Sequence, residues 1–234
     1  MDILEKALKS IGDLDDEAMR RAKERLDNLT KPPGSLGVLE DLAVKLAGMS
    51  GKVFNEFKKK TVIVMAGDHG VVEEGVSAYP REVTPQMVLN FLKGGAAMSV
   101  LSRHGGAEIV CVDIGVAADL DHPKLVTKKI KKGTDNMAKG PAMSREEAVK
   151  ALEVGISTAW DCIDKGSDLL ATGEMGIGNT TPSTAILAAF SGKSLEEIVG
   201  RGSGVDDGRL AKKISAIKKA HRRRARHESR GGGY

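Results

Sequence analysis

A glycine-rich turn that joins an apolar run to an apolar helix carries the clearest chemical signal in this sequence. Residues 169–171 are apolar and predict a buried strand, and Thr181-Pro182 favours a helix start, because threonine caps free amides and proline fits the first helical position. Three glycines follow the strand at loop spacing: Gly173, Gly176 and Gly178. A strand, a glycine loop and a helix N-terminus in this order direct backbone amides and the positive end of the helix dipole at an anion.

Glu174 stands inside this glycine turn and needs a separate explanation. A carboxylate beside an anion site repels the anion. Its presence therefore indicates that the carboxylate acts on another part of a ligand than the anion, such as sugar hydroxyls or a cationic ring. The residues alone leave these two choices open.

Two further loops offer polar groups beside predicted strands. Asp68-His69 follows a continuous β-branched run at 61–67, at the strand end where ligands of open α/β sheets bind. Such a pair is equally compatible with a structural role. Residues 200–204 form a second glycine loop, and Arg201 or Lys213 could add a cation to a bound phosphate. A third glycine segment, less distinct, spans 133–140.

The elements that position these loops predict an α/β fold with a mostly parallel sheet and helices on both faces, a Rossmann-like arrangement. Strands are expected at 61–67, 108–116 and 168–172, and a capping box from Ser144 to Glu147 starts a long helix. Two amphipathic helices, broken near Gly12, precede a Pro/Gly loop at 29–37. Ser35 is expected to cap the next helix, Thr84-Pro85 to begin another, and Asp206-Asp207 to open the last.

The predicted organisation has three parts: an N-terminal helical part at 1–55, an α/β nucleotide-binding domain at 56–220, and an unstructured Arg/Gly-rich tail at 221–234. The tail holds five arginines and one glutamate, which equals the whole net charge of +4. The body is therefore neutral, and no nucleic-acid partner is expected. No apolar run reaches the roughly 20 residues of a membrane span. Neither a membrane partner nor a signal peptide is expected, which favours a cytoplasmic location.

Other site classes fit the sequence poorly. The turn at Gly176 lacks the third glycine and the downstream acidic residue of a dinucleotide-binding fingerprint. No Walker loop or nucleophile elbow occurs, and the five histidines show no metal-ligand spacing. Cys111 and Cys162 have no redox spacing and are interpreted as small buried residues. The residues alone thus predict an α/β protein that binds a phosphorylated small molecule.

Long ordered motifs over residues 1 to about 220 resemble one enzyme family, nicotinate-nucleotide–dimethylbenzimidazole phosphoribosyltransferase. The matching strings are LTKPPGSLG, AGDHGV, EEGVSAYP, EVTPQMV, GTDNMAKGPAMS, TGEMGIGNTTPSTAI and GRGSGVDD. The resemblance implies transfer of ribose 5-phosphate from nicotinate mononucleotide to 5,6-dimethylbenzimidazole, in cobalamin biosynthesis. It also implies a homodimer and neither a metal nor an organic cofactor.

The resemblance implies site residues as well. The phosphate and ribose would contact nine residues: Gly173, Gly176, Gly178, Asn179, Thr180, Gly202, Ser203, Gly204 and Lys213. The aromatic base would lie near Met65, Asp68, His69, Ser77 and Gln86. Glu174 would be the catalytic residue, beside the ribose or its positive charge. Two of these residues have a purely structural alternative. Gln86 could serve only as a helix cap or a packing residue, and Lys213 could lie on a solvated helix face.

This chain also departs from the family pattern. Family members continue considerably further, with more sheet and helix and with the glutamate that serves as general base. At His221 the composition changes from a Lys-rich helix to an Arg/Gly string, which favours a frameshifted or early-ended reading frame. We therefore expect a fold that is incomplete at the C-terminus and a chain with little transferase activity. The alternatives are a non-catalytic nucleotide-binding remnant and, less favoured, a nucleic-acid-binding tail.

Overall fold

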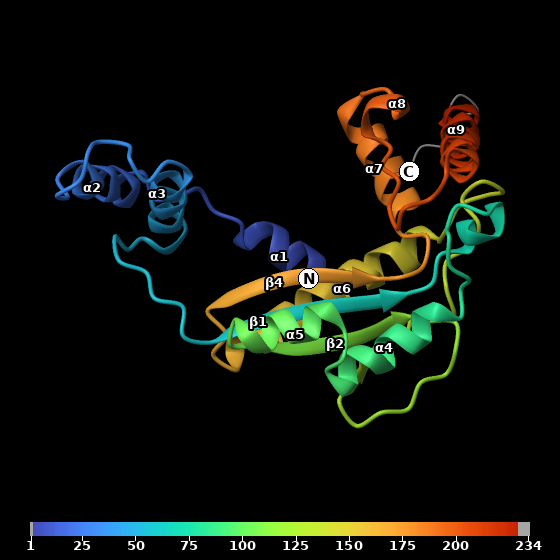
Figure 1. Cartoon of the computed structure of the whole chain (residues 1–234), viewed down its shortest axis with the longest axis horizontal. Coiled ribbons are helices and arrows are strands. Elements are labelled where there is room, and N and C mark those ends of the chain that lie inside the picture. The colour runs from blue at the N-terminus through green and yellow to red at the C-terminus, as the bar shows by residue number, and fades with distance from the viewer. Residues whose placement is uncertain (1, 229–234) are drawn as a thin grey trace. The chain divides into compact units, whose positions relative to one another are not determined.

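The computed structural model describes residues 2–228 of the chain (Figure 1). The chain divides into two compact units, Met1–Lys58 and Lys59–Tyr234. The division lies close to the boundary predicted after residue 55. Each unit is described by itself below.

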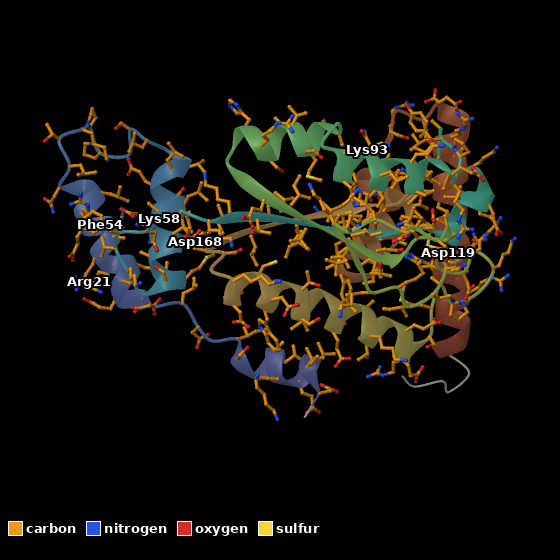
Figure 2. All side chains as sticks on the ribbon, turned by 90° about the horizontal axis from the view of Figure 1, so that it is seen from below. Arg21, Phe54, Lys58, Lys93, Asp119 and Asp168 are labelled. Atoms are coloured by element: carbon orange, nitrogen blue, oxygen red, sulfur yellow. The ribbon has the colours of Figure 1, made fainter. Side chains whose placement is uncertain are left out.

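The first unit consists of three helices, α1 (Ile3–Ser10), α2 (Asp16–Asp27) and α3 (Val38–Ser50). The side chains of Asp2 and Asp15 cap α1 and α2. Small buried residues let α2 and α3 pack closely: Ala18, Ala22 and Ala47. The guanidinium of Arg25 lies 4.3 Å from the ring centre of Phe54, which is labelled in Figure 2. Ser35 does not cap α3, because the helix starts only after Gly37, whose φ of 55° breaks the helical path.

The second unit is built on a four-stranded parallel sheet. Its strands are β1 (Lys60–Gly67), β2 (Ala107–Gly115), β3 (Leu125–Thr127) and β4 (Leu169–Met175), in the order β3-β2-β1-β4. The labelled arrows run in the same direction in Figure 1, as the pairing requires. The α/β fold class predicted from the sequence is confirmed. The short strand β3 was not predicted.

Helices cover both faces of this sheet. Helices α4 (Val83–Lys93) and α5 (Ala97–His104) lie on one face, and α6 (Arg145–Asp164) lies on the other (Figure 1). The predicted capping box between Ser144 and Glu147 is present at the start of α6. Burial, followed by a smaller contribution from Asp113, raises the pKa of the Cys111 thiol to about 11, so this cysteine is an inert core residue.

The other four described helices of the second unit come after β1 or β4 in the chain. They are η1 (Gly70–Glu74), α7 (Thr180–Ser191), α8 (Leu195–Ile198) and α9 (Asp207–Glu228). Ile217 of α9 is fully buried against α7 and α8. This packing holds α9 against the middle of α7, at Ala185 and Ala188.

Helix α9 continues through Glu228, so residues 221–228 of the predicted unstructured tail are helical. The Arg-rich segment favours helix, and two of its residues contact the body. The ring Nε2 of His221 lies 3.0 Å from the Ala185 carbonyl, and Arg223 Nε donates to the Ala138 carbonyl at 3.1 Å. The rest of the predicted tail, 229–234, lies outside the described residues. Within the described part of the chain, no helix is long and apolar enough to cross a membrane.

Candidate functional site

Two of the cavities at the carboxyl ends of the strands contain predicted site residues of the glycine loops and strand ends. The first, the glycine-loop cavity, has a volume of about 130 Å³ and lies between the turn after β4 and the start of α9. The second, the strand-end cavity, has a volume of about 210 Å³ and lies between the ends of β1, β2 and β4 and the first turns of α6. Most of the site residues predicted from the sequence line one of these two cavities.

Six of the predicted phosphate and ribose residues line the glycine-loop cavity: Gly176, Gly178, Asn179, Thr180, Ser203 and Lys213. Gly202 and Gly204 shape its second loop, with φ values of 55° and 86° that favour glycine. Gly173 does not line this cavity, because β4 extends beyond the predicted end at residue 172 and Gly173 pairs with Val64 inside the sheet. The predicted loop therefore begins only at Gly176.

Two contacts determine the path of the first glycine loop. The Ile177 amide donates to Thr84 Oγ1 at 3.0 Å, so the first turn of α4 anchors the loop. A Cβ on Gly176 would lie 2.1 Å from the Gly67 carbonyl oxygen and 2.6 Å from His69 Nε2. Only glycine fits there, because the loop crosses directly over the end of β1.

The start of α7 differs from the prediction. Asn179, not Thr181, is the N-cap residue, and Thr180 is the first helical residue. Pro182 is therefore the third helical residue rather than the first, and a missing N–H also costs nothing there. Thr181 is fully buried, and its hydroxyl has no hydrogen-bond partner among the described residues. Thr84 likewise lies inside α4, after the N-cap Glu82.

Lys213 places a buried ammonium beside the glycine-loop cavity. Its side chain is 1 % exposed, and Nζ donates to Thr180 Oγ1 at 2.7 Å and to the Gly200 carbonyl at 2.9 Å. No acidic side chain in the described part of the chain pairs with it, and burial lowers its pKa. The alternative interpretation of Lys213 as a solvated helix face is wrong. A buried ammonium without a counter-ion favours an anionic ligand.

Arg201 also lines the glycine-loop cavity, but its charge is already paired. One guanidinium nitrogen donates to the Val205 carbonyl at 3.0 Å, and the other lies 2.5 Å from Asp207 Oδ1. Of the two cations considered from the sequence, Lys213 is therefore the one that has no acidic partner among the described residues. The distinction was not available from the sequence, because it depends on how α9 packs.

Glu174 lies in β4 rather than in the loop, and its carboxylate is held from two sides. Oε1 lies 2.8 Å from His69 Nε2, and Oε2 accepts a hydrogen bond from Asn179 Nδ2. The Glu174 side chain is 41 % exposed, and that of His69 is 18 % exposed. Glu174 lines the strand-end cavity while Asn179 lines the glycine-loop cavity. The carboxylate thus lies at the boundary between the two.

The strand-end cavity has largely apolar walls and a few polar groups. Of the five residues predicted to hold an aromatic base, Met65, Asp68 and His69 line it. Ser77 instead lines the glycine-loop cavity, and Gln86 is exposed on α4 and lines neither. The five residues do not form one set, because Ser77 faces the other cavity and Gln86 lies at an exposed position of α4.

Asp68 has a structural task in this arrangement. Its carboxylate is 1 % exposed, accepts a hydrogen bond from the Ala117 amide at 2.7 Å and lies 3.7 Å from Arg81 Nε. Its backbone carbonyl accepts from the Thr134 amide at 2.9 Å. Asp68 therefore joins three loops at the strand ends. Its Oδ2 is engaged by the Ala117 amide, whereas Oδ1 is buried and has no hydrogen-bond partner among the described residues.

Several residues of the strand-end cavity were not identified from the sequence. They are Ile114, Ile130, Lys131, Met143 and Ala151, together with Glu147, which was recognised only as a capping residue. The signal that could have found Ile130 and Lys131 is weak. They follow the three-residue strand β3, whose pattern is too short to distinguish from loop.

Fold and site together define an α/β protein with an anion-suited cavity at the carboxyl ends of a parallel sheet. A family model described as phosphoribosyltransferase matches residues 11–231. The chain is 55 % identical over 221 residues to nicotinate-nucleotide–dimethylbenzimidazole phosphoribosyltransferase of Chloroflexus aggregans, and 55 % identical over 218 residues to that of Geobacter sulfurreducens. These matches cover 94 % and 93 % of this chain.

A solved structure agrees with the sequence relatives. The crystal structure of CobT from Thermus thermophilus superposes with a TM-score of 0.85 at 48 % identity and covers 88 % of this chain. The chain belongs to this phosphoribosyltransferase family. It spans 63 % of the length of the Chloroflexus relative and 62 % of the solved chain.

Proposed function

We propose that this chain takes part in phosphoribosyl transfer from nicotinate mononucleotide to 5,6-dimethylbenzimidazole, a step of cobalamin biosynthesis that yields α-ribazole 5′-phosphate and nicotinate. The names of its relatives support these substrates. The observation that carries the proposal is the buried, unpaired ammonium of Lys213. It lies beside a cavity lined by glycine amides and the start of α7, where a phosphate is favoured.

The phosphate and ribose are assigned to the glycine-loop cavity. Lys213, whose ammonium donates to the Thr180 hydroxyl, forms its charged end, and the turns at Gly176 and Ser203 supply backbone amides. Asn179 adjoins Thr180 and contacts Glu174. A ribose that extends from a phosphate at Lys213 towards Asn179 would therefore meet the carboxylate.

Glu174 is assigned to the charge that develops on the sugar. The ring nitrogen of nicotinate is cationic while it is attached to ribose, and positive charge spreads to the anomeric carbon as that bond breaks. Both oxygens of Glu174 already accept hydrogen bonds, which supports a fixed negative charge at this position. The incoming base attacks the anomeric carbon from the opposite face, so the anomeric centre inverts from β to α. Nicotinate leaves with the electron pair of the broken bond, and the N–H proton of the base passes to solvent.

The strand-end cavity is assigned to an aromatic ring. Its apolar walls and its volume of about 210 Å³ suit a flat bicyclic compound, and Met65, Asp68 and His69 lie on its surface. Ser77 is assigned to the nucleotide instead, because it lines the other cavity. Gln86 is left without a role at either cavity. A homodimer and a cytoplasmic location stay predictions.

Calorimetric titration with nicotinate mononucleotide tests the site. Lys213→Met should weaken binding about 10- to 100-fold, because a charge-assisted hydrogen bond contributes roughly 1.5–3 kcal/mol. Lys212→Met is the matched control, since Lys212 is the exposed neighbour on the same helix. Equal affinity in wild type and Lys213→Met would remove the phosphate assignment.

Nicotinate release tests the transfer itself. Wild-type protein should release nicotinate from the mononucleotide only when dimethylbenzimidazole is added, and Glu174→Gln should slow that release. Binding that depends on Lys213, without release of nicotinate under any condition, would support the second function considered from the sequence, a nucleotide-binding module.

A further inference from the structure

We propose that His69 is a positioning residue that holds the Glu174 carboxylate between the two cavities. The proposal rests on the function proposed for Glu174 above, but its geometry belongs to the ligand-free protein. His69 follows β1 and Glu174 lies on β4, and β1 and β4 are paired in the sheet. No part of this role requires the imidazole to touch a ligand.

The contacts of Glu174 define the clamp. His69 Nε2 lies 2.8 Å from Oε1, and the amide of Asn179 donates to Oε2. An ionised carboxylate only accepts hydrogen bonds, so the contact with Oε1 requires the proton of a neutral His69 to be on Nε2. One donor on each oxygen fixes the rotation of the carboxylate plane.

The surroundings of His69 restrict the imidazole to this position. A Cβ on Gly176 would lie 2.6 Å from Nε2 and 2.7 Å from Cδ2 of the ring. The ring therefore occupies the space that any larger residue at 176 would need. Glycine at this position serves the histidine as well as the loop.

The other charged side chains of the strand-end cavity are engaged elsewhere. Asp68 accepts from the Ala117 amide, and Lys131 Nζ lies 2.8 Å from Asp135 Oδ2. Glu147 accepts from the Ser144 amide at 2.8 Å. Glu174 is therefore the acidic partner of His69, and the clamp acts on that one carboxylate.

We expect loss of the His69 imidazole to lower kcat without changing the affinity for nicotinate mononucleotide. The phosphate is held by Lys213 and the glycine loops, and the imidazole contributes no hydrogen bond to it. Loss of the imidazole would let Glu174 rotate towards solvent, because its side chain is already 41 % exposed. The negative charge would then be misplaced when the sugar–ring bond breaks.

Kinetics of His69→Leu and His69→Gln test the role. His69→Leu should lower kcat on the order of 100-fold, as displacement of a positioned group by about 1 Å can do, while the dissociation constant for nicotinate mononucleotide stays unchanged. His69→Gln keeps an N–H donor that can reach Glu174 and should recover most of kcat. Equal kcat in His69→Leu and wild type, or equal loss in both variants, would overturn the proposal.

Imidazole nitrogen NMR of the ligand-free protein tests the clamp independently of turnover. At a pH where His69 is neutral, wild type should contain the Nε2-protonated tautomer, and Glu174→Gln should give a mixture. Glu147→Gln is the control, since Glu147 lines the same cavity but contacts Ser144. A mixed tautomer in wild type would refute the clamp. If the protein had a single tautomer but no transferase activity, the clamp would stand and the proposed function would be refuted.

Discussion

Lys213 Nζ lies 2.7 Å from Thr180 Oγ1, and the residue before Thr180, Asn179, donates to Glu174. Two consecutive residues at the start of α7 therefore contact the ammonium and the carboxylate of the candidate site. Because both contacts come from the first turn of α7, the backbone geometry of that turn sets the distance between the Lys213 ammonium and the Glu174 carboxylate. Any ligand that uses both charges has to match that spacing.

Lys213 should make the stability of the ligand-free protein depend on alkaline pH. Burial lowers its pKa from 10.5 in the folded state, so between the lowered pKa and 10.5 the unfolded chain binds more protons. Wild type should therefore gain stability relative to Lys213→Met as the pH rises through that window. Urea unfolding of both proteins at a series of pH values measures the difference. A difference that does not change with pH would show that the charge of Lys213 carries no such cost.

Gly176→Ala should destabilise the protein by roughly 1–3 kcal/mol, the usual cost of overpacking. The added Cβ would lie 2.1 Å from the Gly67 carbonyl oxygen, a backbone atom that cannot move aside cheaply. Gly155→Ala is the contrasting change, because Gly155 lies within α6 and a Cβ added there would meet no neighbouring atom within 4 Å. There the substitution should stabilise by roughly 0.5–1 kcal/mol. Thermal or urea unfolding measures both, and similar signs for the two would contradict the expectation.

Asp68→Ala should cost roughly 1–3 kcal/mol of unfolding free energy, because it leaves the Ala117 amide without its acceptor and removes the 3.7 Å contact with the partly exposed Arg81 guanidinium. Asp119→Ala provides the control. Asp119, labelled in Figure 2, is 81 % exposed and pairs with Lys132 at 2.6 Å. An exposed pair contributes only about 0–1 kcal/mol. If Asp68→Ala unfolded like Asp119→Ala, the role of Asp68 in joining the loops would be refuted.

Thr84→Val should loosen the first glycine loop. Valine has nearly the same shape as threonine but cannot accept the hydrogen bond of the Ile177 amide, which costs roughly 1–3 kcal/mol. Affinity for nicotinate mononucleotide should fall with it, because the loop lines the nucleotide cavity. Thr172→Val, at an exposed position of β4, should change stability by less than about 0.5 kcal/mol. Calorimetry and urea unfolding of both variants test the comparison.

The elements with local signals were predictable from the sequence. The β-branched run at 61–67 became β1, the capping box at Ser144 became the start of α6, and the glycine loops became the walls of a cavity. Each of these signals arises within a few residues of chain. They therefore needed no knowledge of what packs against them.

The features that depend on packing were not predictable. Lys213 belongs to a Lys-rich amphipathic helix, and only the contact of α9 with α7 decides that this lysine is buried. Ser77 and Gln86 were grouped with the strand-end residues, but Ser77 lies in a loop that lines the other cavity and Gln86 is exposed on α4. The contacts of His221 with the Ala185 carbonyl and of Arg223 with the Ala138 carbonyl likewise depend on how α9 packs.

The position of Lys213 on α9 couples occupancy of the cavity to the folding of the last helix. An anion that binds the native ammonium shifts the local opening equilibrium of α9 by mass action, in proportion to its concentration over its dissociation constant. Ile217, one turn further along, keeps the helix docked on α7 and α8 when the cavity is empty. Backbone amides of α9 would then exchange with deuterium more slowly in the liganded protein. The exchange rate of this helix would therefore measure how much of the glycine-loop cavity is occupied.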